Sequence, residues 1–139
     1  MILLDTNVIS ELMRREPNPA VLAWVDAQPA QMLHVSAVTR AEIELGIALL
    51  PEGRRKKGLH EAAVAMFAEF SGRCLPFDEQ AASRYAELAA RRTRSGRPIS
   101  VEDAQIAAVA LAGGLILATR NTDDFVGITG LSLIDPFGG

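Results

Sequence analysis

Several residue types are scarce in this 139-residue sequence, and each shortage excludes a class of protein. A single cysteine, Cys74, rules out a disulfide framework and a cysteine-based metal site, and we expect it to be a small buried hydrophobe. The aromatic content of 5% leaves few rings on which bases could stack. No internal repeat is present, which excludes a solenoid. Because there is no basic leader and no apolar run of bilayer length, we expect a cytoplasmic protein without a membrane partner.

Hydrophobic residues, in contrast, make up 49% of the chain, enough for one domain with a real core. The net charge of −3 hides a pattern. Residues 1–50 carry 6 acidic and 3 basic side chains, residues 51–100 carry 6 and 10, and residues 101–139 carry 5 and 1. This balance excludes a globally basic nucleic-acid binder, but it allows a local basic surface.

Short apolar runs alternate with segments of helical periodicity along the chain. The runs 2–4, 32–35, 115–118 and 131–134 predict buried strands, and 74–77 predicts an edge strand because it contains a proline. Helices are predicted from residue 19 with Asn18 as cap, over 39–49, 54–71 and 79–94 (capped by Asp78), and from the Ser100 cap to residue 112. The alternation predicts a single α/β domain over residues 1–139, with a mostly parallel sheet between two layers of helices.

Acidic residues lie where predicted elements begin or end. Asp5 follows the first strand, and the segment from Asn121 to Asp124 follows the strand at 115–118. Glu42 and Asp103 lie three residues after Thr39 and Ser100, the spacing of a capping box. Helix capping explains each of these acids taken singly. Taken together, they lie at positions that converge at one edge of a parallel sheet, where ligands bind.

A cluster of carboxylates is costly without a cation, because the charges repel each other. Hard divalent ions such as Mg²⁺ prefer such oxygen ligands. A zinc site is not supported, since His34 and His60 are isolated in the sequence. Metal-free acid–base chemistry by paired carboxylates stays open as an alternative.

Four segments in order carry a resemblance to a known family: 1–8 (MILLDTNV), 36–46 (SAVTRAEIELG), 102–108 (EDAQIAA) and 118–125 (ATRNTDDF). The sequence resembles the PIN-domain, VapC-type toxins, in particular their FitB-like branch, along its whole length. The resemblance implies cleavage of RNA that depends on Mg²⁺ or Mn²⁺. It implies metal-binding and catalytic roles for Asp5, Glu42 and Asp103, with Asn121 or Asp124 as the fourth residue. Supporting roles fall on Thr6, Asn7 and Thr119.

The resemblance also implies partners. These are an RNA substrate, a cognate VapB- or FitA-like antitoxin that binds DNA and blocks the site, and a second copy of the chain, for which the apolar helices 59–70 and 81–90 offer surfaces. Two basic groups are candidates for phosphate binding: Arg54, Arg55, Lys56 and Lys57, and Arg91 and Arg92. The alternative, preferred for the first group, is a solvated helix start, and the second group lies at a helix C-terminus, where cations are favoured in any case. Because Asn121 brings no charge, a non-catalytic PIN-like module that binds RNA or a partner is the alternative function.

Overall fold

One sheet of five parallel strands organises the molecule, in a computed structural model that describes residues 1–138. The strands are β1 (Ile2–Leu4), β2 (Leu33–Ser36), β3 (Cys74–Leu75), β4 (Ile116–Ala118) and β5 (Leu133–Ile134). Their order is β3-β2-β1-β4-β5. The chain therefore builds outward from β1 in one direction through β2 and β3, and in the other through β4 and β5. The order reverses beside β1, and ligands bind at such a switch point in open parallel sheets.

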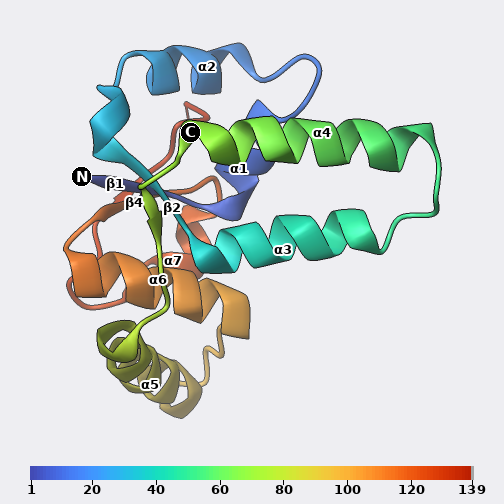
Figure 1. Ribbon diagram of the computed structural model, residues 1–139. Helices are drawn as coiled ribbons and strands as arrows, with labels where there is room; N and C mark the ends of the chain where they lie inside the picture. Colours follow the sequence, from blue (N-terminus) through green and yellow to red (C-terminus); the bar gives the residue numbers. More distant parts are fainter. Residues whose placement is uncertain (139) are drawn as a thin grey trace.

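Helices connect the strands and cover both faces of the sheet (Figure 1). They are α1 (Thr6–Leu12), α2 (Pro19–Asp26), α3 (Ala37–Ala48), α4 (Arg54–Glu69), α5 (Glu79–Arg94), α6 (Val101–Gly113) and the single turn α7 (Thr122–Phe125), with a short 3₁₀ turn at Ala30–Met32. Parallel strands require such crossovers, because a tight hairpin cannot join them. The three-layer α/β/α fold predicted from the alternation of elements is confirmed.

The side chains of β1 alternate between two cores. Leu3 packs with residues of α5, α6 and α7 on one face, whereas Ile2 and Leu4 pack with α1, α2, α3 and α4 on the other. Leu3 and Leu4 are completely buried. Burying a leucine in this way contributes about 1.5–3 kcal/mol. The central strand is thus fixed from both sides, which holds the residue that follows it in place.

Most of the predicted helix ends are confirmed. The side chain of Asn18 accepts from the backbone N–H groups of Ala20 and Val21, and that of Asp78 accepts from Ala81 N–H. Ser100 accepts from Asp103 N–H, and Gly114 ends α6 in the left-handed conformation at φ 67°. A non-glycine residue at that φ would be strained.

Three details of the sequence-based prediction are wrong or incomplete. Helix α3 begins at Ala37 and its cap is Ser36, not Thr39. Cys74 is exposed rather than buried, because the two-residue edge strand β3 has only β2 as a neighbour. Helices α1 and α7 were not predicted as such, since both are too short to show a clear periodicity.

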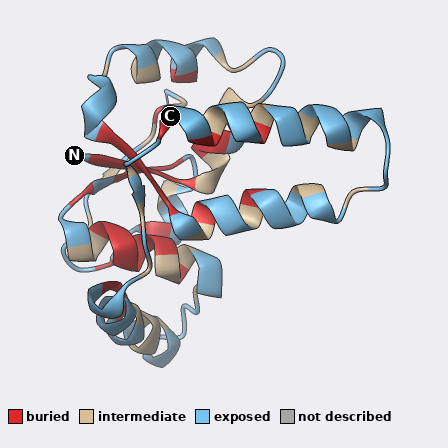
Figure 2. Ribbon diagram, in the orientation of Figure 1, coloured by how far each residue is buried: buried red, intermediate tan, exposed pale blue. Residues whose placement is uncertain are grey.

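Helices α3 and α4 form a hairpin that extends away from the sheet, and its outer part is largely exposed (Figure 2). Three apolar side chains of this hairpin face solvent: Leu45, Leu49 and Val64. None of the helices in residues 1–138 has the length and hydropathy needed to cross a bilayer.

Candidate active site

The carboxyl ends of β1, β2 and β4 lie side by side at the switch point of the sheet. Asp5 follows β1, Thr119 follows β4, and Ser36 is the last residue of β2. The backbone N–H of Asp5 donates to the carbonyl of Ala118 across 2.9 Å, which continues the pairing of β1 with β4 to this edge. The register of the sheet therefore places Asp5 directly beside Thr119.

Asp5 is a buried carboxylate, with 3% of its surface exposed. Its Oδ1 accepts from Thr6 N–H across 2.8 Å, so Asp5 also caps α1. Its Oδ2 accepts from the hydroxyl of Thr119 across 2.7 Å and from the amide of Asn7 across 3.2 Å. Burial raises the pKa of Asp5 to about 6, although the hydrogen bonds from Thr119 and Thr6 oppose the shift. Both interpretations of Asp5, as a cap and as a site residue, are compatible with these contacts.

Glu42 stands at the end of a chain of hydroxyl groups. The hydroxyl of Thr6 donates to Oε1 of Glu42 across 2.8 Å and lies 2.9 Å from the hydroxyl of Thr39. A hydroxyl has one proton to donate, so Thr39 must donate to Thr6, and Ser36 in turn donates to Thr39 across 3.4 Å. Glu42 is thus oriented by Thr6 of α1, whose hydroxyl is held in turn by the buried hydroxyls of Thr39 and Ser36, instead of closing a capping box with Thr39.

Asp103 lies in the first turn of α6, where its backbone N–H donates to Ser100 Oγ across 3.2 Å. Burial raises the pKa of its half-buried carboxyl, a side-chain hydrogen bond with Ser100 lowers it, and the charges of Asp124 and Glu102 raise it further. Burial also raises the pKa of Glu42, which the bond from Thr6 lowers and the charge of Asp103 raises. The carboxylates are therefore close enough to repel each other.

A cleft of about 490 Å³ brings these side chains together. Asp5, Glu42, Asp103 and Asn121 all line it, together with Thr6, Asn7, Ser10, Glu11 and Arg14. The structure thus unites most of the residues predicted for the site. Asp124 is absent from the lining, but it acts on the cleft through the effect of its charge on the pKa of Asp103. Thr119 is also absent from the lining, but its hydroxyl donates to the carboxylate of Asp5.

Of the four carboxylates that line the cleft, only Glu11 is paired with a basic side chain of residues 1–138. The ion pairs among residues 1–138 join Arg14 to Glu11, Arg40 to Glu44 and Lys56 to Glu52, and none of them includes Asp5, Glu42 or Asp103. Unpaired carboxylates with raised pKa values are a feature of functional sites. Their mutual repulsion makes the arrangement unfavourable for the protein alone, and a bound cation would offset that repulsion.

The donor set suits Mg²⁺ or Mn²⁺, because it consists of carboxylate oxygens and the side-chain carbonyl of Asn121. Within residues 1–138, no three His, Cys, Asp or Glu side chains are placed so that they alone could hold an ion. A Mg²⁺ site does not require three such ligands, because this ion usually binds one or two carboxylates and keeps several water molecules. The carboxylate and amide oxygens present therefore fit a hydrated divalent cation by their chemistry.

The two predicted basic groups differ in their surroundings. At the start of α4, Arg55 lines a groove of about 380 Å³ that also includes Thr6 and Glu42, next to the cleft. In the same group, Lys56 is engaged with Glu52 and the carbonyl of Ala48. At the end of α5, Arg92 donates to the backbone carbonyls of Arg97 and Asp124. Arg92 thus holds the α7 turn, a structural task that the sequence did not reveal.

Sequence reasoning missed Glu11 and Arg14, which line the cleft from the end of α1. Glu11 is buried, with 7% of its surface exposed, although it is charged. Its only signal in the sequence is its place among apolar neighbours in a short segment with no clear period. In such a segment, the sequence does not show whether a single acidic side chain is buried or exposed.

The family model described as PIN domain matches residues 2–130. The chain is similar to VapC ribonuclease Y4jK of Sinorhizobium fredii, with 45% identity over 138 residues, 99% of this chain and 98% of that protein. It is similar to Toxin FitB of Neisseria gonorrhoeae, with 45% identity over 126 residues, 90% of this chain and 91% of FitB. Its fold is similar to the structure of FitAB bound to an IR36 DNA fragment, with 41% identity, a TM-score of 0.89, and coverage of 99% of this chain and 96% of that one.

Proposed function

The chain belongs to the PIN-domain family, and we propose that it is an endoribonuclease that depends on Mg²⁺ or Mn²⁺ and acts as the toxin of a toxin–antitoxin pair. The observation that carries this proposal is the cleft at the switch point, where Asp5, Glu42 and Asp103 meet without a counterion. The names of the relatives, a VapC ribonuclease and a toxin, support the same reaction and the same biological role.

In this proposal, Asp5, Glu42 and Asp103 surround a hydrated cation and bind it directly or through its water molecules, with Asn121 contributing its carbonyl oxygen and Asp124 adding negative charge nearby. When bound, the ion would lower the pKa of a water molecule and offset the charge that develops on the scissile phosphate. The protein supplies orientation. Thr119, Asn7 and Thr6 fix the carboxylate of Asp5, and Thr6 engages only one oxygen of Glu42, which leaves Oε2 for the ion or a water molecule.

The proposed partners are RNA, a VapB- or FitA-like antitoxin that binds DNA, and a second copy of the chain. The similar structure of FitAB on DNA supports the antitoxin. Leu45 and Leu49, one helical turn apart at the end of α3, are exposed and support a protein interface, as does the exposed Val64 on α4, because neighbouring exposed apolar groups are a feature of such surfaces. We place the protein, as one PIN domain over residues 1–139, in the cytoplasm.

The test is cleavage of RNA by the purified chain in Mg²⁺, in Mn²⁺ and in EDTA. We expect cleavage with either metal and none in EDTA. Asp103→Asn should lower the rate at least about 100-fold, beyond the usual effect of losing a group that merely orients a ligand. Glu44→Gln is the matched control, because Glu44 lies outside the cleft and pairs with Arg40 on the surface. An Asp103→Asn variant that cuts at the normal rate would contradict the proposal. RNA binding without any cleavage would favour the alternative function, a non-catalytic module, which the uncharged side chain of Asn121 suggests.

A further inference from the structure

We infer that Arg14 binds a phosphate group of the RNA next to the bond that is cut, and that Glu11 positions Arg14 for this task. The inference rests on the proposed function and assigns a contact to its substrate. Glu11 lies in the last turn of α1, Arg14 lies two residues beyond its end, and both line the cleft.

Arg14 is the one basic side chain among the described residues that line the cleft. The other ionisable groups there are Asp5, Glu11, Glu42 and Asp103, all of them acids. RNA is a polyanion, and it must approach these carboxylates closely for its backbone to be cut. A guanidinium at the rim lowers the electrostatic cost of that approach and fixes the position of a phosphate.

Arg14 does not neutralise the acids that form the proposed metal site. Its ion pair is with Glu11, at 3.2 Å between Nη1 and Oε2. The hydrogen bonds of the side chain all come from Nη1, so Nε and Nη2 have no partner among residues 1–138. The side chain of Arg14 is 66% exposed. Two donors of a planar fork are therefore free to bind two phosphate oxygens.

The carboxylate of Glu11, which pairs with Arg14, is itself held in a fixed position. This carboxylate is buried, and Oε2 also accepts from the backbone N–H of Asn18 across 2.9 Å. Asn18 is the cap of α2, so Glu11 ties the end of α1 to the start of α2. A buried, doubly held carboxylate restricts where the guanidinium of Arg14 can lie. Less side-chain freedom is then lost when a phosphate binds.

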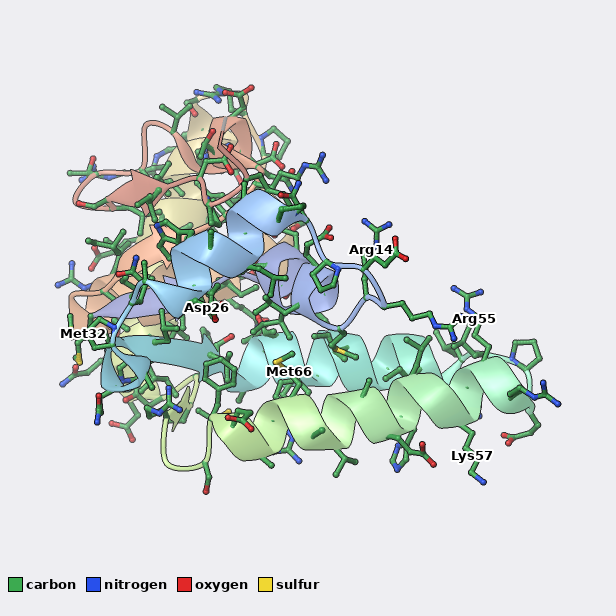
Figure 3. The ribbon with its side chains drawn as sticks, turned by 90° about the horizontal axis from the view of Figure 1, so that it is seen from above. Arg14, Asp26, Met32, Arg55, Lys57 and Met66 are labelled. Atoms are coloured by element: carbon green, nitrogen blue, oxygen red, sulfur yellow. The ribbon has the colours of Figure 1, made fainter. Side chains whose placement is uncertain are left out.

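The groove beside the cleft has a mostly apolar lining, which includes Met13, Ile47 and Leu59, and it carries a second arginine besides Arg14. Arg14 lines this groove together with Arg55, and Figure 3 shows both side chains on the same side of the molecule. A backbone that leaves the cleft through the groove would pass a second guanidinium. Two guanidinium groups along one path suit successive phosphates of an RNA strand, whereas a single acidic side chain of a protein partner needs one cation only.

The experiment measures steady-state cleavage of an RNA oligonucleotide in Mg²⁺ by the full chain and three variants, at several salt concentrations. Arg15→Ala is the matched control, because Arg15 is the exposed neighbour with the same charge and does not line the cleft. Arg14→Ala should raise KM about tenfold, the effect of losing one hydrogen bond to a charged group, and change kcat less than KM. The slope of log KM against log salt should fall by about 1. Arg14→Lys should recover part of the loss, since it restores the charge but not the fork.

Equal KM values for Arg14→Ala and Arg15→Ala would overturn the inference while leaving the nuclease proposal intact. So would a loss of thermal stability in Arg14→Ala that accounts for the lost activity and that Arg14→Lys does not restore. An effect confined to inhibition by an antitoxin would overturn it in favour of a protein contact. If the wild-type chain cuts no RNA under any of these conditions, the proposed function fails first, and the inference fails with it.

Discussion

The hydroxyl of Thr119 donates to Oδ2 of Asp5 across 2.7 Å, and this buried bond joins residues 114 positions apart in the chain. It exists because β1 and β4 pair in parallel and end at the same level, with Leu4 opposite Ala118. Among the interactions that keep the pKa of Asp5 from rising further, it is the largest. The charge state of the central acid therefore depends on how the two strands are aligned.

Replacing Thr119 by valine should test that dependence. Thr119→Val keeps the side-chain shape but leaves Oδ2 of Asp5 with Asn7 as its remaining side-chain donor. We expect the pKa of Asp5 to rise above about 6 and the protein to lose about 1–3 kcal/mol of stability. The acidic limb of the pH–rate profile should move to higher pH. Thr119→Ser is the control, because it keeps the hydroxyl, and an unshifted profile in Thr119→Val would contradict the role of this bond.

The raised pKa of Asp5 also predicts an unusual dependence of stability on pH. In the folded, metal-free chain this pKa is about 6, against about 3.9 in an unfolded chain. Between these values the folded state holds more protons, so the free energy of unfolding falls as pH rises from about 4 to 6 and stays lower above that range. The loss from this group is on the order of 3 kcal/mol. The raised pKa values of Glu42 and Asp103 act in the same direction.

Thermal unfolding in EDTA at pH 5 and pH 7.5 measures this effect. Asp5→Asn has no carboxyl to titrate, so the gap in Tm between wild type and this variant should differ between the two pH values. Added Mg²⁺ should raise the Tm of the wild type more at pH 7.5 than at pH 5, because protons compete for the same carboxylates. A gap that is the same at both pH values would contradict a raised pKa for Asp5.

Much of the fold and the core of the site follow from local sequence. The strand that ends at Leu4 predicts a residue at the sheet edge, and caps such as Asp78 and Ser100 mark where helices begin. Asp5 and Asp103 were found in this way, because strand ends and helix starts leave short-range signals. The sheet then brings them to one cleft.

The contacts around Glu42 could not be predicted in the same way. Thr39 and Glu42 have the spacing of a capping box, yet the cap is Ser36, and Thr39 is free to join the chain of hydroxyls that reaches Glu42 through Thr6. The difference depends on a partner 36 residues away in the chain, which no local pattern contains. The same holds for Glu11, whose burial depends on how the loop before α2 folds over it.

The fourth residue of the site can be decided by a pair of variants. Asn121 lines the cleft without a charge, and Asp124 has a charge outside the lining. If Asn121 is the ligand, Asn121→Asp should tighten Mg²⁺ binding, because affinity rises with the number of charged ligands. Asp124→Asn should then lower the pKa of Asp103 and reduce the rate by only a few-fold. Titration of each variant with Mg²⁺, followed by calorimetry, shows whether Asn121 or Asp124 is the fourth residue of the site. Asp123→Asn is the control, since Asp123 is a neighbouring exposed acid that contributes to none of the raised pKa values.

Variants of Arg91 and Arg92 should distinguish phosphate binding from structural support at the end of α5. The guanidinium of Arg92 donates to the carbonyls of Arg97 and Asp124, across 2.8 Å and 3.0 Å, and so fastens the turn that presents Asp124. Arg91 reaches only the hydroxyl of Thr129, at 3.4 Å. We therefore expect Arg92→Ala to destabilise the protein by about 1–3 kcal/mol and to lower activity at all salt concentrations alike. Arg91→Ala should leave stability unchanged.

Salt dependence then shows which of the two arginines contacts RNA. If Arg91 binds a phosphate, its loss should reduce the salt slope of RNA binding by about 1, whereas a residue that only supports the α7 turn leaves that slope unchanged. Equal slopes for wild type and both variants would remove the end of α5 from the RNA path. The basic middle of the sequence would then act through the start of α4, where Arg55 already lies in the groove beside the cleft.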